Sequence, residues 1–472
     1  MTTAPHEIEQ VWGNYFLIGL GNGAAMFDPV RLETVYLTED ETTAVRESGD
    51  SIVADLARFG FAPPNSAAPP ANFSESVTNR LQDMGIRSAP SHIAGYRIVV
   101  TDRCNMKCSY CFVDTNTGNP DMTEEQLRQG LDLLFEVNQG RAEVTYQWFG
   151  GEPTIRHDLM RAGDAYAREL AAEKGVARIQ PTVVTNGAQI RPELIDHFLE
   201  YGYGVGVSID GPPATNSLER VLLSGKPADE RIHRNIKRMI DSGVHVGANV
   251  TPTDWNVGNL TEIVDYVMSL GIRFIYVNTP IPSHGAWIAH GPDLARNLFE
   301  ARMRAISQGG MLFSHLDRIY QSLDSRRPRV YEHIQEDGGV NVALLPGGRI
   351  SVLDLNWRDP RFIFTLDEIR ADNAKLGRAA KTLYPFQDCE RCPAVAICGG
   401  PSQNEHRSCV STRGYVSPRG MLRLCPYDRR HEVSVLRPRD SIRDSLAAMR
   451  RSPAPVGPTC ALVCGEDGQC HT

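Results

Sequence analysis

Length, composition and charge narrow the class of protein before any motif is considered. A chain of 472 residues exceeds one ordinary hydrophobic core, so two or three domains are expected. Hydrophobic residues make up 41% and charged residues 22%, which is typical of a globular protein and excludes a disordered or fibrous one. The net charge of −8 argues against a nucleic-acid partner, and the lack of a long apolar run argues against a membrane one. No secretory signal opens the chain, so we expect a cytoplasmic protein.

The first 62 residues show the pattern of a small α+β unit. Tyr15–Leu20 is a short apolar run, and the Asn-Gly pair that follows favours a turn into a return strand over Ala25–Phe27. Apolar residues then recur at helical spacing over Ser51–Phe59. A Pro- and Ala-rich run comes next, so we predict a linker over 63–95.

Between residues 96 and 305, strand-like and helix-like segments alternate. Thr123–Asn138 is a predicted helix that opens on a capping-box pattern, Thr-Glu-Glu-Gln. Such alternation predicts parallel strands covered by helices, in a partial barrel or in a doubly wound sheet. In both architectures the reactive groups belong at the carboxyl ends of the strands. The six β-rich runs are Tyr96–Thr101, Val144–Trp148, Thr182–Thr185, Gly204–Ile209, His245–Val250 and Phe274–Asn278.

The eleven cysteines fall into three groups. In a reducing compartment, clustered cysteines point to metal ligation or redox chemistry rather than to disulfides. The second group lies within residues 306–436, where Gly-Gly turns replace the alternation and we predict an irregular domain pinned by metal. The third group lies in a tail over 437–472. The groups are Cys104, Cys108 and Cys111; Cys389, Cys392, Cys398, Cys409 and Cys425; and Cys460, Cys464 and Cys470.

The first cysteine group directly follows the first strand of the alternating region. Three thiolates in one loop can hold three corners of a cubane iron–sulfur cluster, which leaves the fourth iron open to a substrate or cofactor. Zinc is the alternative, but a structural zinc site needs a fourth protein ligand, and neither His nor Cys follows within 40 residues. The spacing therefore favours a cluster.

Over roughly residues 96–300 the chain resembles the radical S-adenosylmethionine (SAM) superfamily. Two motifs carry the resemblance: the C-x3-C-x2-C loop after the first strand, and Gly150-Gly151-Glu152-Pro153 at the end of the second. The resemblance implies an α/β fold with a partial (β/α)6 TIM-like barrel, a [4Fe–4S] cluster on the three cysteines, and SAM at the open iron. It also implies that the glycines allow a close backbone approach and that Glu152 meets the methionine ammonium.

Other segments at strand ends resemble family segments that line the SAM site. Asn186 ends the third run, and Ser208 and Asp210 end the fourth, where they offer hydroxyl and carboxylate contacts. The resemblance implies that Arg220 pairs with the SAM carboxylate, whose geometry a guanidinium matches, and that Tyr110 lies beside the adenine. Surface solvation of Arg220 and core packing of Tyr110 are the alternatives.

The resemblance further implies the type of chemistry. A flavodoxin- or ferredoxin-type donor would supply one electron, SAM would be cleaved to a 5′-deoxyadenosyl radical, and that radical would abstract hydrogen from the substrate. The cofactors supply this reactivity, and the barrel supplies orientation and a dry site.

Four cysteines of the second group resemble the SPASM domain of peptide-modifying radical SAM enzymes. The resemblance implies that they hold one auxiliary [4Fe–4S] cluster, with a structural zinc as the alternative. Ser402 stands where the family pattern C-x2-C-x5-C-x3-C has its fourth cysteine, and Leu353 stands at an upstream cysteine position. The family's other auxiliary cluster is therefore expected to be absent in its usual form. The four cysteines are Cys389, Cys392, Cys398 and Cys425.

Four cysteines remain, which is the number that a second auxiliary cluster needs. We hypothesise that they hold one; thiols without a metal are the alternative, and Cys409 can also replace Cys425 in the first auxiliary cluster. Asp354 follows Leu353, near the position of an acidic base in sulfatase-maturing relatives, so it is a candidate catalytic base, with a surface carboxylate as the alternative. The four remaining cysteines are Cys409, Cys460, Cys464 and Cys470.

Residues 1–62 resemble the peptide-recognition elements of enzymes that modify ribosomally made peptides. Those elements bind a leader peptide as an added strand; a structural cap on the barrel is the alternative. The prediction is thus an oxidoreductase that crosslinks or otherwise oxidises side chains of a precursor peptide. An anaerobic sulfatase (formylglycine) maturase and an enzyme acting on a small molecule are the alternatives. The missing auxiliary-cluster cysteines and the N-terminal unit count against the sulfatase maturase.

Overall fold

The structure is a computed structural model whose described residues fall into two compact units. The smaller unit includes residues 8–27 and 34–61, and the larger includes residues 28–33 and those from 73 onward. Asp354 and the eight cysteines from Cys389 to Cys470 lie outside the described residues. The described residues are 8–12, 15–20, 22–61, 73–84, 92–111, 113, 115–253, 255–278, 291–314, 317, 322, 325–328, 339–352, 360–381 and 396.

The larger unit is built on a ten-stranded sheet of order β13-β12-β11-β9-β8-β7-β5-β14-β15-β16. All strands from β13 to β14 pair in parallel, whereas β15 and β16 are antiparallel additions. The strands are β5 (His92–Val99), β7 (Glu143–Phe149), β8 (Arg178–Thr185), β9 (Gly204–Ser208), β11 (His245–Val250), β12 (Phe274–Val277), β13 (Met311–Phe313), β14 (Gly339–Leu345), β15 (Arg349–Val352) and β16 (Ile363–Thr365).

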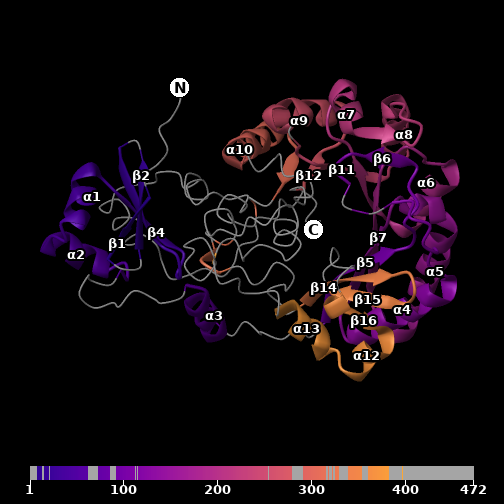
Figure 1. Ribbon diagram of the computed structural model, residues 1–472, viewed down its shortest axis with the longest axis horizontal. Helices are drawn as coiled ribbons and strands as arrows, with labels where there is room; N and C mark the ends of the chain where they lie inside the picture. Colours follow the sequence, from indigo (N-terminus) through magenta and orange to yellow (C-terminus); the bar gives the residue numbers. More distant parts are fainter. Residues whose placement is uncertain are drawn as a thin grey trace, which may run out of the picture. The chain divides into compact units, whose positions relative to one another are not determined.

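The strand order decides between the two architectures that the sequence allowed. A doubly wound sheet reverses its order at a switch point, but here each of the six predicted strands is added beside the one before it. This order is that of a partial barrel, so the predicted α/β fold is confirmed. Figure 1 shows the connecting helices along the outer side of the strands. They are α4 (Glu124–Val137), α5 (His157–Lys174), α6 (Pro192–Tyr201), α8 (Asp229–Asp241), α9 (Leu260–Ser269) and α10 (Gly291–Ser307).

The helix α4 begins where the capping box predicted. The Thr123 hydroxyl accepts from the Gln126 backbone N–H at 3.2 Å, and the Gln126 side chain accepts from the Thr123 N–H at 3.2 Å. These two bonds satisfy amides that the first helical turn leaves without partners. Leu127, Leu131 and Leu134, one face of the helix, are fully buried.

Alternate residues of the parallel strands pack outward against the helices. In β7 the buried side chains of Tyr146 and Trp148 donate to Asp164 of α5, at 2.7 and 3.2 Å. His197 of α6 adds its Nε2 at 2.9 Å from the same fully buried carboxylate. The intervening residues of β7 face the other side of the sheet and are less buried; among them, Gln147 accepts a bond from Arg97 at 2.9 Å. The inner face of the sheet is therefore the more open one.

Beyond residue 305 the described part of the chain is more regular than the sequence predicted. A turn through Gly347 and Gly348, both with positive φ, joins β14 to β15. The β14 strand pairs in parallel with β5, with Val342 opposite Tyr96. Two helices follow, α12 (Leu366–Ala371) and α13 (Ala374–Lys381). A further helix, α3 (Phe73–Asp83), lies within the range predicted as a linker.

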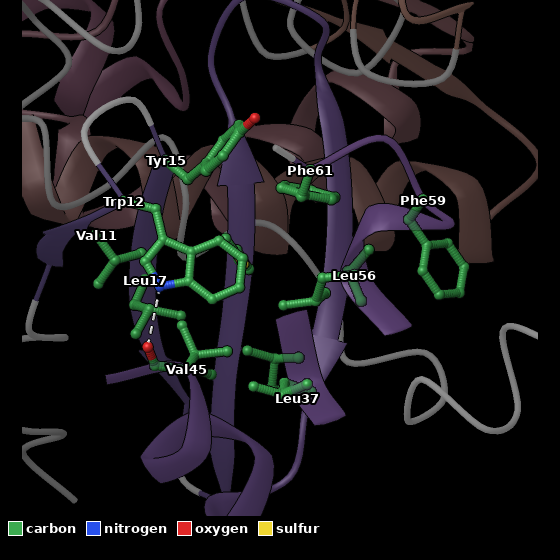
Figure 2. Packing of buried hydrophobic residues seen from close by; sticks show 13 residues of the cluster. Val11, Trp12, Tyr15, Leu17, Leu37, Val45, Leu56, Phe59 and Phe61 are labelled. Atoms are coloured by element: carbon green, nitrogen blue, oxygen red, sulfur yellow. Dashed lines mark hydrogen bonds between the residues drawn. The ribbon is translucent and has the colours of Figure 1, made fainter. Parts of the chain in front are cut away.

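The smaller unit is a four-stranded sheet with two helices. Its strands follow one another in the order β1-β2-β3-β4, and the first two pairs are antiparallel. Figure 2 shows their buried side chains meeting those of the helices; Trp12 also donates to the Val45 carbonyl at 3.1 Å. The elements are β1 (Ile8–Val11), β2 (Tyr15–Leu20), β3 (Gly23–Asp28), β4 (Glu33–Leu37), α1 (Glu39–Arg46) and α2 (Asp50–Ala57).

Sequence patterns found half of the elements of this unit. The bounds of β2 were predicted as observed, and β3 and α2 overlap their predicted ranges. The helix α1 was missed, although Thr38 and Glu41 form a second capping box there. Among the described residues of both units, no helix combines the length and apolar character needed to cross a bilayer.

Candidate metal and cofactor site

The three cysteines of the first group lie in one loop at the carboxyl end of β5, as the sequence predicted. None of the three forms a disulfide; Cys104 and Cys108 are half-buried and Cys111 is exposed. Burial raises the pKa of the Cys104 thiol to about 12, so metal loading there must displace a proton. In the described part of the chain, no three Cys, His, Asp or Glu side chains surround a single ion position.

A two-stranded ribbon holds the middle cysteine. The strand β6 (Met106–Cys108) pairs antiparallel with β10 (Arg220–Leu222), and Cys108 lies opposite Arg220. The Ser109 N–H donates to the Glu219 carbonyl at 3.0 Å, one residue further along. Glu219 ends α7 (Pro213–Glu219), which follows β9, so the ribbon joins the cysteine loop to the carboxyl end of another barrel strand.

The Gly150-Gly151-Glu152 segment is bound to the same loop by backbone hydrogen bonds. The Gly151 N–H donates to Thr101 at 2.9 Å, and the Glu152 N–H donates to Arg103 at 2.8 Å. A Cβ atom at Gly151 would overlap the carbonyl oxygens of Asp102 and Arg103, and one at Gly150 would overlap that of Thr101. Both glycines are therefore required by the approach of the cysteine loop, in addition to any approach of a cofactor.

The Glu152 carboxylate is buried and bonded within the protein. It accepts from the Thr154 hydroxyl at 2.6 Å, the Thr185 hydroxyl at 2.8 Å and the Asn186 backbone N–H at 2.7 Å. Burial raises the pKa of Glu152, while these bonds oppose the rise. The carboxylate thus ties the end of β7 to the end of β8. Its predicted contact with a methionine ammonium stays a prediction. Pro153, which is buried, begins the short η1 helix (Pro153–Arg156).

Tyr110, Asp210 and Arg220 form one connected group. The Tyr110 hydroxyl donates to Asp210, and Arg220 donates to the Tyr110 oxygen at 2.5 Å. The Arg220 Nη1 lies 3.8 Å from the Asp210 carboxylate, and both residues are buried. Burial raises the pKa of Asp210, which the guanidinium opposes. Surface solvation of Arg220, the alternative from the sequence, is wrong.

Replacing Arg220 with leucine is expected to destabilise the fold, because it leaves Asp210 buried without its cation. Breaking one side of a buried ion pair costs about 3–5 kcal/mol. The cost should be smaller at acidic pH, where Asp210 can take up a proton, and larger near neutral pH, where it cannot. Chemical denaturation at both pH values measures the difference.

Arg304→Leu is the matched control for this prediction. Arg304 and Asp265 form an ion pair at 2.7 Å, but both side chains are largely exposed. Exposed pairs contribute little to stability, so this variant should unfold like the wild type at both pH values. Equal losses in the two variants would contradict the assignment of Arg220 as a buried counter-charge.

The two remaining predicted residues lie at neighbouring strand ends. Asn186 is buried beside the cysteine loop, and its side-chain amide donates to Asn105 at 2.7 Å. Ser208 is the last residue of β9 and is half-buried on the inner, more open face of the sheet. The roles of both in binding SAM stay predictions.

The arrangement fits a cluster with a bound carboxylate-bearing cofactor. Three thiols that form no disulfide with one another share one loop, and that loop is fastened on two sides by backbone bonds. In the described structure the buried Nε of Arg220 has no hydrogen-bond partner, so it remains available to an acceptor. Cys104, Cys108 and Cys111 would hold the iron, and Arg220 would meet a carboxylate.

Sequence patterns did not predict the bonds by which two residues fasten this site. Thr185 donates to Glu152, as described above, and Asn116 bonds to both backbone groups of Cys104. Asn116 has a φ of +58°, a conformation that asparagine adopts more readily than most residues. Its position in an Asn-Thr-Gly stretch was the available signal, but a turn explains such a stretch equally well.

Comparisons with known proteins agree with this geometry. The model of the radical SAM superfamily matches residues 98–267. A serine-type anaerobic sulfatase-maturating enzyme of Bacteroides thetaiotaomicron is 28% identical over 181 residues. The match covers 36% of this chain and 42% of that enzyme, so the chain spans less than half of that relative.

Two solved structures share the fold at low sequence identity. Native anSMEcpe with bound AdoMet has a TM-score of 0.58 at 15% identity, over 72% of this chain and 98% of that one. Streptococcus suis SuiB bound to the precursor peptide SuiA has a TM-score of 0.51 at 16% identity, over 88% of this chain and 96% of that one. A [4Fe–4S] cluster and SAM are the cofactors of the superfamily. Residues 98–267 of this chain therefore form a radical SAM superfamily domain.

Proposed function

We propose that this enzyme reductively cleaves SAM and abstracts hydrogen from a ribosomally made precursor peptide, forming a crosslink or another oxidative side-chain modification. The observation that carries the proposal is the cysteine loop at the carboxyl end of β5, fastened to the Gly150-Gly151-Glu152 segment at the end of β7. Reactive groups in barrels of this kind lie at that end of the strands.

The chain's own residues would bind and orient the cofactors. When bound, the cluster and SAM supply one-electron cleavage of the sulfonium bond and hydrogen abstraction. Cys104, Cys108 and Cys111 would hold three irons as thiolates. Arg220 would orient the cofactor carboxylate through its unpartnered Nε, while Asp210 and Tyr110 hold the guanidinium in place. The open inner face of the sheet would accept the substrate.

Two features of the chain support a peptide substrate. The SuiB structure, whose partner is a precursor peptide, accounts for 88% of this chain, whereas the anSMEcpe structure accounts for 72%. A separate four-stranded unit with its own core precedes the barrel, and a sheet edge can bind a leader peptide as an added strand. A flavodoxin- or ferredoxin-type protein would supply the electron.

The cysteines beyond residue 388 would hold auxiliary clusters. We propose one [4Fe–4S] cluster on Cys389, Cys392, Cys398 and Cys425, with Cys409 as the substitute for Cys425. A second would use the four cysteines that remain, and Asp354 would act as a base near the substrate. Iron content after joint replacement of Cys460 and Cys464 tests the second cluster, because unchanged iron excludes it.

The experiment that tests the function uses the anaerobically reconstituted full chain, SAM, a reductant and a short peptide encoded beside the gene, in heavy water. We expect 5′-deoxyadenosine to form and the peptide to lose a pair of hydrogens per event. Mass spectrometry reads both. A peptide that keeps its hydrogens and gains deuterium would show epimerisation instead, and an untouched peptide would contradict the proposed substrate.

An anaerobic sulfatase maturase is the second candidate. The sequence match to the Bacteroides enzyme and the coverage of 98% of anSMEcpe favour it. A sulfatase-derived peptide with a serine or cysteine at the modified position discriminates the two. Conversion of that residue to formylglycine, with the neighbouring precursor left unchanged, would replace the leading proposal.

A further inference from the structure

Asn116 fastens the backbone of Cys104 on both sides. Its Oδ1 accepts from the Cys104 N–H at 3.1 Å, and its Nδ2 donates to the Cys104 carbonyl at 3.2 Å. The Asn116 N–H in turn donates to the Asp102 carbonyl at 2.9 Å, and Thr117 bonds to the Asp102 carboxylate. The segment that follows the cysteine loop therefore folds back and hydrogen-bonds to the backbone of the first cysteine of that loop.

Asn186 approaches the same cysteine from the end of β8. Its Oδ1 accepts from the Ala188 N–H at 2.9 Å, which fixes the orientation of the amide. The Nδ2 must then point the other way, where it donates to Asn105 at 2.7 Å and to the Cys104 sulfur at 3.8 Å. Asn186 is buried, so this N–H lies in surroundings of low polarity, where a hydrogen bond to sulfur has a larger effect than in water.

We propose that Asn116 and Asn186 are positioning residues that divide the control of Cys104 between them. Asn116 holds the backbone and so retains the iron, and Asn186 raises the reduction potential of the cluster through its N–H to the sulfur. This inference rests on the proposed function, because it takes Cys104 to be a cluster ligand.

The two effects have different physical origins. Reduction adds negative charge to the cluster and its thiolates, and a donated N–H stabilises that charge, so hydrogen bonds to the sulfur raise the potential. The Asn116 amide reaches no sulfur in the described structure; it restricts the conformations of the loop when iron is lost or bound. Replacing each asparagine should therefore change a different measured quantity: iron retention for Asn116 and the reduction potential for Asn186.

The test compares Asn116→Gly and Asn186→Ala in the anaerobically reconstituted full chain. Glycine adopts a φ of +58° without strain, so Asn116→Gly removes the amide and keeps the backbone. We expect iron to pass to a ferrous chelator about tenfold faster, because two hydrogen bonds are lost, with little change in potential. Asn186→Ala should instead shift the midpoint potential to a more negative value, in a titration followed by electron paramagnetic resonance without SAM.

Two reference variants make the result specific. Cys104→Ala identifies the iron and the resonance signal that belong to this site, and the exposed Asn119→Gly is the matched control for the loop. Asn116→Asp, which keeps the acceptor for the Cys104 N–H, should release iron at an intermediate rate. Wild-type iron release in Asn116→Gly, or an unchanged or more positive potential in Asn186→Ala, would overturn the inference alone. An unchanged signal in Cys104→Ala would overturn the proposed function as well.

Discussion

Replacing Cys108 with alanine is expected to abolish 5′-deoxyadenosine formation and to lower the iron content by about four atoms per chain, the complement of one cubane cluster. Cys108 is the middle cysteine of the loop and the only cysteine that lies in the β6–β10 ribbon of the described structure. Two thiolates would then remain in the loop, one fewer than the proposed cluster needs. Iron analysis and product detection after anaerobic reconstitution measure both losses.

Lys107→Ala is the matched control for this variant. Lys107 is the neighbouring residue of the same strand, and it is exposed. Its replacement leaves the backbone pairing with Val221 intact, so iron content and product formation should stay close to those of the wild type. Full iron content in Cys108→Ala would show that the ribbon holds Cys108 for packing alone.

Gly151→Ala should displace the cysteine loop, although it replaces none of the three cysteines. The added Cβ would overlap the carbonyl oxygens of Asp102 and Arg103, which belong to the backbone and cannot rotate away. Overpacking of this kind costs about 1–3 kcal/mol, and here the segment that must move carries Cys104. We expect lower stability by chemical denaturation and a reconstituted iron content below that of the wild type.

Gly258→Ala controls for the substitution itself. Gly258 lies in a short helical turn, η2 (Val257–Asn259), and a Cβ there would meet no atom within 4 Å. Neither Gly151 nor Gly258 has a positive φ, so both replacements avoid that form of backbone strain. Iron retention in Gly151→Ala equal to that in Gly258→Ala would mean that the loop shifts without loss of its ligands.

Sequence patterns predicted the barrel strands well because buried apolar residues at alternate positions and turns at both ends mark such strands clearly. The run His245–Val250 has the observed bounds, and Phe274–Asn278 ends one residue beyond the strand. The cysteine loop and Gly150-Gly151 were predicted because chemistry and close approach restrict the residue types there. These signals are local in the sequence, which is why they can be recognised without the structure.

The parts that escaped prediction depend on partners far away in the sequence. Asn116 and Thr185 are ordinary turn and strand residues until the fold brings them to Cys104 and Glu152. The β14 strand pairs in parallel with β5, a strand more than 200 residues earlier in the sequence, and no local pattern identifies that neighbour. For Glu152 the motif was recognised from the sequence, but the bonds that its carboxylate accepts from Thr185 and Asn186, at the end of β8, were not predicted.

The pairing of Tyr96 with Val342 also bears on the order in which the protein can mature during synthesis. Until the ribosome has made β14, one side of β5 presents unpaired backbone groups, and β5 leads directly into the cysteine loop. A nascent chain that ends before residue 339 therefore exposes an unpaired strand edge next to the thiols of the cysteine loop. Iron delivery to the loop should follow translation of the β14–β15 hairpin, and truncated chains should aggregate before they acquire metal.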